Sequence, residues 1–313
     1  MALRRLTTLP LAAAFVLAAA ACGPRTPAPR PAPSPTGATP TPAAPTPVPT
    51  TAIPVTPGSS GRIVAWAPGF SSYLVTSQAA VHVEGDTLGP RDDSVSTRAR
   101  LTVRVSPASA PNGVVVTVDS FLVSPKRGAP MASALTYPLV FQAQLDPARL
   151  RIDFLAEQSM LGVACTGPGA TLLALARDLA PALPSPLERG RRWSETTTTQ
   201  LCRSGVPLTI TSRHEWTVEG EVESGGRVLV RLTRESQSTI AGTGTGRRTG
   251  ASIEGTGRAS AEYLLDPTAG RLQAATVQST TELRVRERPE LSPLVTRQEA
   301  RQDAVLQEAG QQR

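Results

Sequence analysis

Hydrophobic and polar residues alternate along most of the chain that follows residue 72. The first run puts five apolar side chains on one face: Tyr73, Val75, Ala79, Val81 and Val83. The same period of two recurs in residues 99–105, 114–118, 139–145 and 150–155, and then in 208–218, 228–234, 252–265 and 271–285. This period is typical of strands with one buried face, and turn residues separate the runs. The pattern predicts a mainly β, antiparallel fold.

One segment follows a helical period instead. Leu172, Leu175 and Leu179 recur at the spacing of a single helix face, and Pro181 ends the pattern. We therefore expect one central amphipathic helix near residues 169–180, between two β-rich halves.

The two halves share one local pattern. Leu145-Asp146-Pro147 and Leu265-Asp266-Pro267 each end a predicted strand, and a returning strand follows. An Asp side chain can cap such a turn and proline fixes its φ, so two interpretations stay open. Either the halves are two similar β units, or the same turn chemistry arose twice.

The first 61 residues cannot join a packed core. Residues 1–21 have the pattern of an export signal, with Arg4 and Arg5 before an apolar run that is too short to span a bilayer. Thirteen of the 30 prolines lie between Pro24 and Pro57, so residues 22–61 are predicted to be a disordered linker. We expect a β-rich globular domain over 62–293 and a polar C-terminal tail over 294–313.

The end of the export signal, Ala19-Ala20-Ala21-Cys22, resembles the lipobox of bacterial lipoproteins. The resemblance implies that Cys22 receives diacylglycerol after cleavage, which would anchor the chain in a membrane of the cell envelope. Gly23 in place of Asp beside the cysteine implies, by the same resemblance, the outer membrane, on either its periplasmic or its surface side. The family prefers Leu at the position of Ala19, so cleavage by the ordinary signal peptidase is the alternative.

Two further resemblances concern the folded part. The run Leu183-Pro184 to Pro186-Leu187, followed by Gly190 and Trp193, resembles a signature of β-rich bacterial envelope lipoproteins. A curved sheet with the helix of residues 169–180 across its concave face would resemble the half-barrels of lipoprotein carriers. The implied fold is an antiparallel curved sheet or half-barrel.

Charge and composition remove several function classes. The net charge of +7 falls to +3 once Arg4, Arg5, Arg25 and Arg30 are set aside, which leaves no basic footprint for nucleic acid. Eleven aromatic residues and two histidines provide little material for stacking platforms or His-rich sites. The chain also lacks a G-x-S-x-G nucleophile motif. We expect no enzyme activity, no metal, no other cofactor and no nucleic-acid partner.

Two of the three cysteines remain once Cys22 is assigned to the lipid. An exported protein folds in an oxidising compartment, so Cys165 and Cys202 are predicted to form a disulfide. A metal or redox role would need more ligands or a C-x-x-C pair, and the chain has neither.

His214 shares a strand face with apolar residues and is predicted to point inward. A buried imidazole needs a hydrogen-bond partner, so His214 is either a satisfied core residue or a functional residue in a cavity. The helix of residues 169–180 has few places to lie except across the sheet. The candidate ligand cavity is therefore lined by Leu172, Leu175, Leu179, Leu208, Ile210, His214 and Trp216.

The densest set of metal-ligand residue types is better explained by solvent exposure. His82, Glu84 and Asp86 alternate near a strand end, and Asp92 and Asp93 follow across a turn. Carboxylates suit a hard cation, but these residues occupy the strand face that is expected to meet water.

Two other groups of residues also have simple explanations. The glycines at 242, 244, 246 and 250 lack the Lys-Ser/Thr of a phosphate loop, and they fit close approach of another element to a strand. Arginines within 98–104 and 284–288 fit a solvated sheet face, the alternative being basic stripes toward anionic lipid.

These features together predict a membrane-tethered envelope lipoprotein without catalysis. It would bind a lipophilic ligand in a β groove. The alternative is an anchored adaptor or structural module that binds another envelope protein. An envelope hydrolase has the least support, because no nucleophile or metal set is visible.

Overall fold

The computed structural model describes residues 66–85, 89–106, 113–125, 131–132, 139–146, 151–154, 169–179, 181, 183, 186–203, 206–244 and 250–307. Of residues 131–132, 143–146, 151–154, 169–171, 173–174 and 201–203 it describes the backbone alone.

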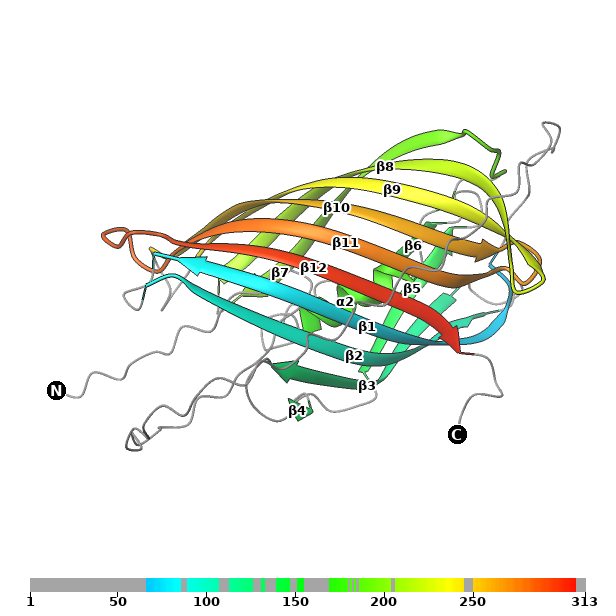
Figure 1. Ribbon diagram of the computed structural model, residues 1–313, viewed down its shortest axis with the longest axis horizontal. Coiled ribbons are helices and arrows are strands. Elements are labelled where there is room, and N and C mark those ends of the chain that lie inside the picture. Colours follow the sequence, from blue (N-terminus) through cyan, green and yellow to red (C-terminus); the bar gives the residue numbers. More distant parts are fainter. Residues whose placement is uncertain are drawn as a thin grey trace, which may run out of the picture.

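Twelve strands of this part of the chain form one curved, unclosed antiparallel sheet (Figure 1). The strands are β1 (Gly69–Glu84), β2 (Arg91–Val105), β3 (Gly113–Pro125), β4 (Met131–Ala132), β5 (Leu139–Asp146), β6 (Arg151–Phe154), β7 (Arg192–Arg203), β8 (Val206–Ser224), β9 (Arg227–Thr243), β10 (Ser252–Asp266), β11 (Arg271–Arg286) and β12 (Leu294–Gln307). Their order in the sheet is β6-β5-β3-β2-β1-β12-β11-β10-β9-β8-β7, and β4 lies beside β3. The prediction of a mainly β, antiparallel fold is confirmed.

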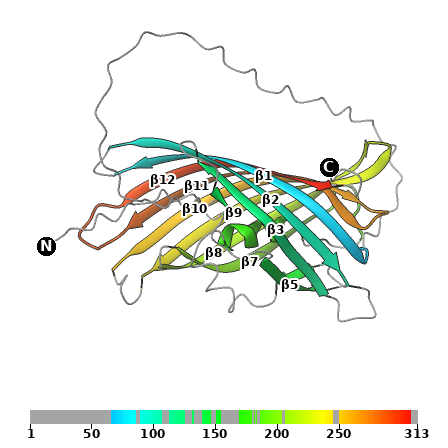
Figure 2. The ribbon, with the colours of Figure 1, turned by 90° about the horizontal axis from the view of Figure 1, so that it is seen from below.

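The route of the chain explains where its helix lies. The chain starts at β1 in the middle of the sheet and proceeds strand by strand to the edge strand β6. It then crosses to the opposite edge, β7, and returns by hairpins to β12, which pairs with β1. The crossing segment contains α2 (Gly169–Asp178), and Figures 1 and 2 show this helix within the concave side of the sheet.

Each strand buries one face, as the alternation of its sequence predicts. Along β1 the odd-numbered residues from Tyr73 to Val83 are buried, and on β3 Val114, Val116 and Val118 are fully buried. The predicted outward arginines Arg98, Arg100, Arg104, Arg284, Arg286 and Arg288 are all exposed. We call the buried, concave side the inner face and the other side the outer face.

The inner face carries two separate apolar clusters. The larger one joins α2 to the sheet and includes Leu172, Leu175, Leu179, Trp216 and Tyr263. The smaller one lies toward the other ends of β8–β11 and consists of Val206, Leu208, Ile240, Ala251, Ile253 and Leu283, with Ile210 and Val285 packed against it. The amphipathic character of the helix stays a prediction, because several of its side chains are outside the described ones.

Residues 294–307 differ from the predicted polar tail. They form β12, which pairs with β1 and β11 in the middle of the sheet. The inner positions of β12 include Thr296, Gln298 and Gln302, which are polar yet at most 7% exposed. Because these polar residues interrupt the apolar ones on its buried face, such as Ala304 and Leu306, this strand lacks the hydrophobic alternation that identified the others.

The two Asp-Pro patterns both lie at strand ends within hairpins. Asp146 ends β5, and Pro147 lies outside the described residues. Asp266 ends β10, and its carboxylate accepts hydrogen bonds from the backbone N–H groups of Thr268 and Ala269 at 3.0 and 2.8 Å. Both hairpins belong to one continuous sheet. The two halves of the described part therefore share a single sheet and do not form two separate β domains.

The glycine series is only partly a strand feature. β9 ends at Thr243, and Gly250, with φ of +89°, lies in the turn before β10, while Gly246 is outside the described residues. Close approach does explain Gly242 and Gly255. A Cβ atom at Gly242 would overlap the carbonyl of Pro207, and one at Gly255 would overlap the carbonyl of Glu282.

Candidate functional site

The site with the richest chemistry lies where the C-terminal end of α2 meets the inner face of β7–β10 and β12. The helix packs there through Leu172, Leu175 and Leu179, each at most 1% exposed. Trp216 of β8 belongs to the same apolar cluster and is equally buried. Four of the seven predicted cavity residues are therefore brought together.

A buried ion pair fixes the end of the helix to the sheet. The guanidinium of Arg234, on β9, donates a hydrogen bond to Asp178 Oδ1 of α2 at 3.1 Å. The two side chains are 12% and 9% exposed. Gln302 of β12 donates to the other carboxylate oxygen of Asp178 at 3.4 Å. Buried charges need such partners, because an unpaired one would cost several kcal/mol, about 3–5.

Two aromatic rings lie beside this arginine. The guanidinium carbon of Arg234 lies 5.4 Å from the ring centroid of Trp216 and 5.4 Å from that of Tyr263. Trp193 of β7 stacks on Trp216, with centroids 5.5 Å apart and planes 1° from parallel. A desolvated cation beside aromatic faces gains cation–π attraction of about 2 kcal/mol.

A second carboxylate lies on the same face. Glu195 of β7 accepts a hydrogen bond from the indole N–H of Trp216 at 3.1 Å. Arg177 of α2, next to Asp178, donates to the hydroxyl of Thr199 on β7. Burial raises the pKa of Tyr263 above its ordinary value, so its hydroxyl stays protonated.

One buried donor of this group, the Nε of Arg234, has no hydrogen-bond partner within the described part of the molecule. The hydroxyl of Tyr263 interacts with the Asp178 carboxylate. Unpartnered buried donors are rare in folded proteins, so this group has hydrogen-bonding capacity to spare. Arg234 can donate five hydrogen bonds, and Asp178 accepts from one of its nitrogens.

His214 lies on the inner face among hydroxyl groups. Its Nδ1 is 2.8 Å from the Ser236 hydroxyl and its Nε2 is 3.1 Å from the Thr197 hydroxyl. Burial, and then the nearby charge of Arg234, lowers the pKa of His214 to about 4. The imidazole is therefore neutral at physiological pH, with one nitrogen donating and the other accepting.

The remaining two predicted cavity residues lie elsewhere. Leu208 and Ile210 belong to the smaller apolar cluster, whose members include no described residue of α2. Between them and Trp216, the inner positions of β8 and β9 carry small polar residues such as Ser212, Ser236 and Ser238. That these two residues line one cavity with the helix stays a prediction, although the inner face is not apolar along its whole length.

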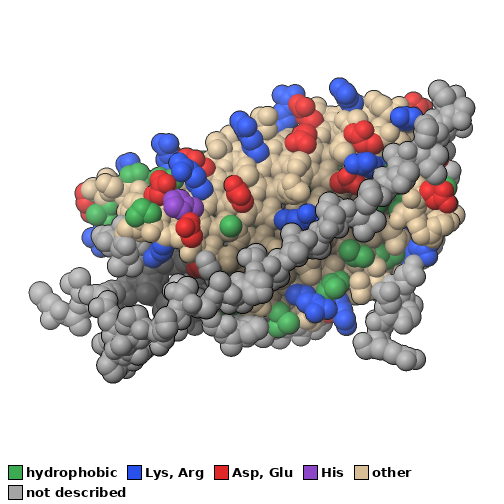
Figure 3. Space-filling view, viewed as in Figure 1, with side chains coloured by type: hydrophobic (Ala, Val, Ile, Leu, Met, Phe, Trp, Pro, Cys, Tyr) green, Lys and Arg blue, Asp and Glu red, His purple; other side chains and the backbone are tan. Residues whose placement is uncertain are grey.

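A hollow of about 790 Å³ lies in the middle of the sheet and contains none of the seven predicted residues. Most of the residues that line it face outward from the sheet, among them Gln78, Arg258, Gln278, Glu299 and Arg301. Figure 3 shows that charged side chains of both signs are scattered over this outer face.

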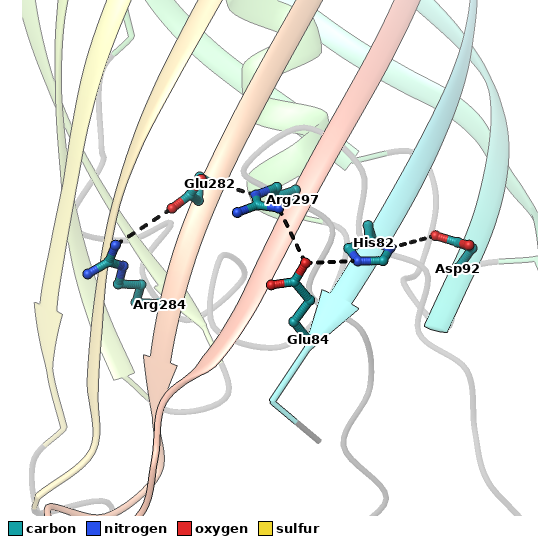
Figure 4. Close-up of polar contacts among 6 residues, drawn as sticks. All are labelled: His82, Glu84, Asp92, Glu282, Arg284 and Arg297. Carbon is teal, nitrogen blue, oxygen red and sulfur yellow. Dashed lines mark hydrogen bonds and ion pairs between the residues drawn. The ribbon is translucent and has the colours of Figure 1, made fainter. Parts of the chain in front are cut away.

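The His82 group forms part of a surface network of charges (Figure 4). His82 contacts Asp92 at 2.7 Å and Glu84 at 3.1 Å, and Arg297 bridges Glu84 and Glu282 at 3.3 Å each. The hydrogen bond to Asp92 raises the pKa of His82. Asp86 is outside the described residues, and within them no set of three or more acidic, His or Cys side chains could hold a metal ion.

The residues predicted for anchoring and cross-linking are not tested by the structure. Cys22 and Cys165 lie outside the described residues, and only the backbone of Cys202 is described. Lipidation and the Cys165–Cys202 disulfide stay predictions. No helix in the described ranges is both long and apolar enough to cross a membrane.

Sequence reasoning missed the polar members of this site. Arg234 and Asp178 are 56 positions apart in the sequence. Each is a charged residue of a type that is common at protein surfaces, so neither stands out from its segment. A usable signal was the inward parity of Arg234, which shares a strand face with Leu232 and Val230. An arginine at an inward position needs a buried acid, and α2 has only Asp178.

Comparison with known proteins does not place the chain in a family. No protein-family model matches it, and no curated protein does. Among solved structures it is similar to OprB of Pseudomonas putida, with 8% identity and a TM-score of 0.26 over 75% of this chain and 94% of that one. It is also similar to an outer membrane channel from Pseudomonas putida F1, with 12% identity and a TM-score of 0.23 over 81% and 100% of the two chains.

A third similar structure is a domain described as an outer membrane lipoprotein-sorting protein, from Vibrio parahaemolyticus. The identity is 9% and the TM-score 0.17, over 76% of this chain and 87% of that one. At such identities and TM-scores these likenesses carry no argument about what this chain binds or where it acts.

Proposed function

We propose that this protein is a lipid-anchored envelope protein that binds an amphiphile by its apolar chain, without catalysis. The ligand would bind to the concave inner face of the sheet beneath α2, which we call the trough. Helix α2 and the apolar chain of the ligand would occupy this trough alternately. One observation carries the proposal. The apolar inner face is covered, within the described residues, by a single ten-residue helix and not by a second sheet.

The helix is a cover that a ligand can replace. A ten-residue helix is marginal by itself in water, so its place depends on its contacts with the sheet. Burial of Leu172, Leu175 and Leu179 stabilises the docked helix by about 5–9 kcal/mol in total. Burial of about 15 methylene groups of an acyl chain would contribute about 12 kcal/mol, which is enough to exchange with the helix.

The rest of the chain supports the same role. The predicted lipid on Cys22 and the Pro-rich linker over residues 22–61 would hold the sheet near a membrane, at the end of a long tether. The extended limit of such a linker is roughly 120 Å. A tethered carrier of this kind would receive and release amphiphiles within the envelope, and the outer membrane is the proposed location.

Titration of the full chain carrying Cys22→Ser with N-phenyl-1-naphthylamine tests this proposal. The uncharged probe fluoresces in apolar surroundings, so we expect saturable binding. Leu175→Ala should lower the stability by about 2–5 kcal/mol and, because it weakens docking of the helix, strengthen probe binding about tenfold or more.

Leu283→Ala is the matched control. Leu283 is 3% exposed but belongs to the smaller cluster, so its loss should lower stability without changing the affinity for the probe. No saturable binding in the unaltered chain, or an equal change of affinity in both variants, would contradict the proposed function.

The anchored adaptor is the second candidate, and the edge strand β7 favours it. Among the described residues β7 pairs with β8 alone, so its other side presents main-chain groups that could take up a strand of a partner. A chain that binds no probe at any concentration would fit this candidate.

A further inference from the structure

The ion pair of Arg234 and Asp178 at the end of α2 suggests which headgroup the amphiphile carries. We propose that Arg234 receives an anionic headgroup, a carboxylate or a phosphate, and that Asp178 occupies the same place from within the chain. This inference rests on the proposed function and names the ligand class for the same trough.

The surroundings of Arg234 are those of an anion site. The guanidinium lies against the rings of both Trp216 and Tyr263, 5.4 Å from each centroid, which limits its position before any anion arrives. Its Nε has no hydrogen-bond partner within the described part of the chain. A planar guanidinium can donate to both oxygens of a carboxylate or phosphate, and the Asp178 carboxylate uses one of its donors.

The place of Asp178 on the helix points the same way. It is the last residue of α2, where the helix dipole disfavours a negative charge. The charge is stabilised there by partners on the sheet, Arg234 and Gln302. The carboxylate therefore stabilises docking of the helix but disfavours the helix by itself.

Exchange of the two anions would conserve the buried charge. When α2 leaves, Asp178 returns to water, and the headgroup of the ligand takes its place at Arg234. Glu195 needs no rearrangement, because it accepts its hydrogen bond from Trp216. An uncharged headgroup would leave Arg234 without a hydrogen-bonded carboxylate and with only the charge of Glu195 nearby, which is costly. The site should therefore discriminate an acid from an alcohol that has the same chain.

Displacement of N-phenyl-1-naphthylamine by oleic acid and by oleyl alcohol tests this discrimination in the full chain carrying Cys22→Ser. We expect the acid to bind about tenfold or more tightly than the alcohol. Arg234→Gln should abolish this preference. Asp178→Asn should strengthen binding of both ligands and keep the preference, because it removes the internal competitor and not the receptor.

Two further variants make the result unambiguous. Asp178→Asn with Arg234→Gln removes both members of the buried ion pair, so this double variant should fold and bind both ligands equally. Arg231→Gln removes an arginine on the outer side of the same strand, paired with Glu262 at 2.7 Å, and should keep the preference. Equal binding of acid and alcohol by the unaltered chain, or a preference that survives Arg234→Gln, would overturn the inference. Displacement by neither ligand would instead overturn the proposed function.

Discussion

At the scale of single residues, the inner face is defined by polar side chains that the sheet places among apolar ones. Arg234 and His214 lie on this face, and Asp178 approaches it from the end of α2. The pair of Arg234 and Asp178 joins α2 to the sheet, and we propose that it also selects the headgroup. The sequence pattern identified His214 as an inward residue but not Arg234 or Asp178, because these two partners are distant in sequence.

His214 provides a prediction of this scale through its depressed pKa. The imidazole has a pKa of about 4 in the folded protein and about 6.5 when the chain is unfolded. Between these values the unfolded chain binds a proton that the folded chain does not. The contribution of His214 to the free energy of unfolding is therefore complete above about pH 6.5 and is lost as the pH falls toward 4.

Replacement of His214 by Gln should flatten this pH dependence by up to about 3 kcal/mol. Urea unfolding between about pH 4.5 and about pH 7.5 measures the difference between the unaltered chain and the variant. His82→Gln is the control, because the pKa of His82 is raised and its contribution falls as the pH increases. An unchanged slope in His214→Gln would show that the imidazole is not held neutral.

At the scale of elements, β12 carries more of the fold than its sequence suggests. It is the strand that joins the first half of the sheet to the second, through β1 and β11. Its inner residues Thr296, Gln298 and Gln302 are buried although they are polar. The edge strands, by contrast, each have one neighbour.

A stop codon after Pro293 should therefore prevent folding, because it removes β12 and leaves β1 and β11 as open edges. A stop codon after Gln307 keeps β12 whole, and the melting temperature should stay within about 4 °C of the full chain. Circular dichroism during heating distinguishes the two. A cooperative, unshifted transition in the shorter chain would contradict the central place of β12.

Hydrophobic alternation predicted the strands whose inner face is apolar and failed where it is not. The buried positions of β1, β2 and β3 are mostly apolar and recur at nearly every second residue, so their faces could be read from the sequence. β9 continues past its predicted end at residue 234, since its next inner residues are Ser236 and Ser238. Polar residues on the inner faces of neighbouring strands lie side by side because of the register between the strands. A single sequence does not reveal that register.

At the scale of the whole molecule, the topology itself forces a segment across the trough. β6 and β7 are the two edges of the sheet and are consecutive strands of the chain, so the segment that joins them has to pass from one edge to the other. The helix within it was expected on the concave side for a similar reason, although the sequence could not fix its contacts. In the proposed function, this segment is the part of the chain that the ligand displaces.

The central claim is that α2 must leave the sheet when an amphiphile binds. A covalent link between Arg177→Cys on α2 and Thr199→Cys on β7 tests it most directly, because these two side chains are in contact. The link is made with a short bismaleimide in a chain whose three native cysteines are serine, and the control carries the same two cysteines blocked separately with a monofunctional maleimide. We predict that the linked protein takes up no N-phenyl-1-naphthylamine, whereas the blocked control binds it. Equal uptake by the linked and the blocked protein would contradict the exchange of helix and ligand.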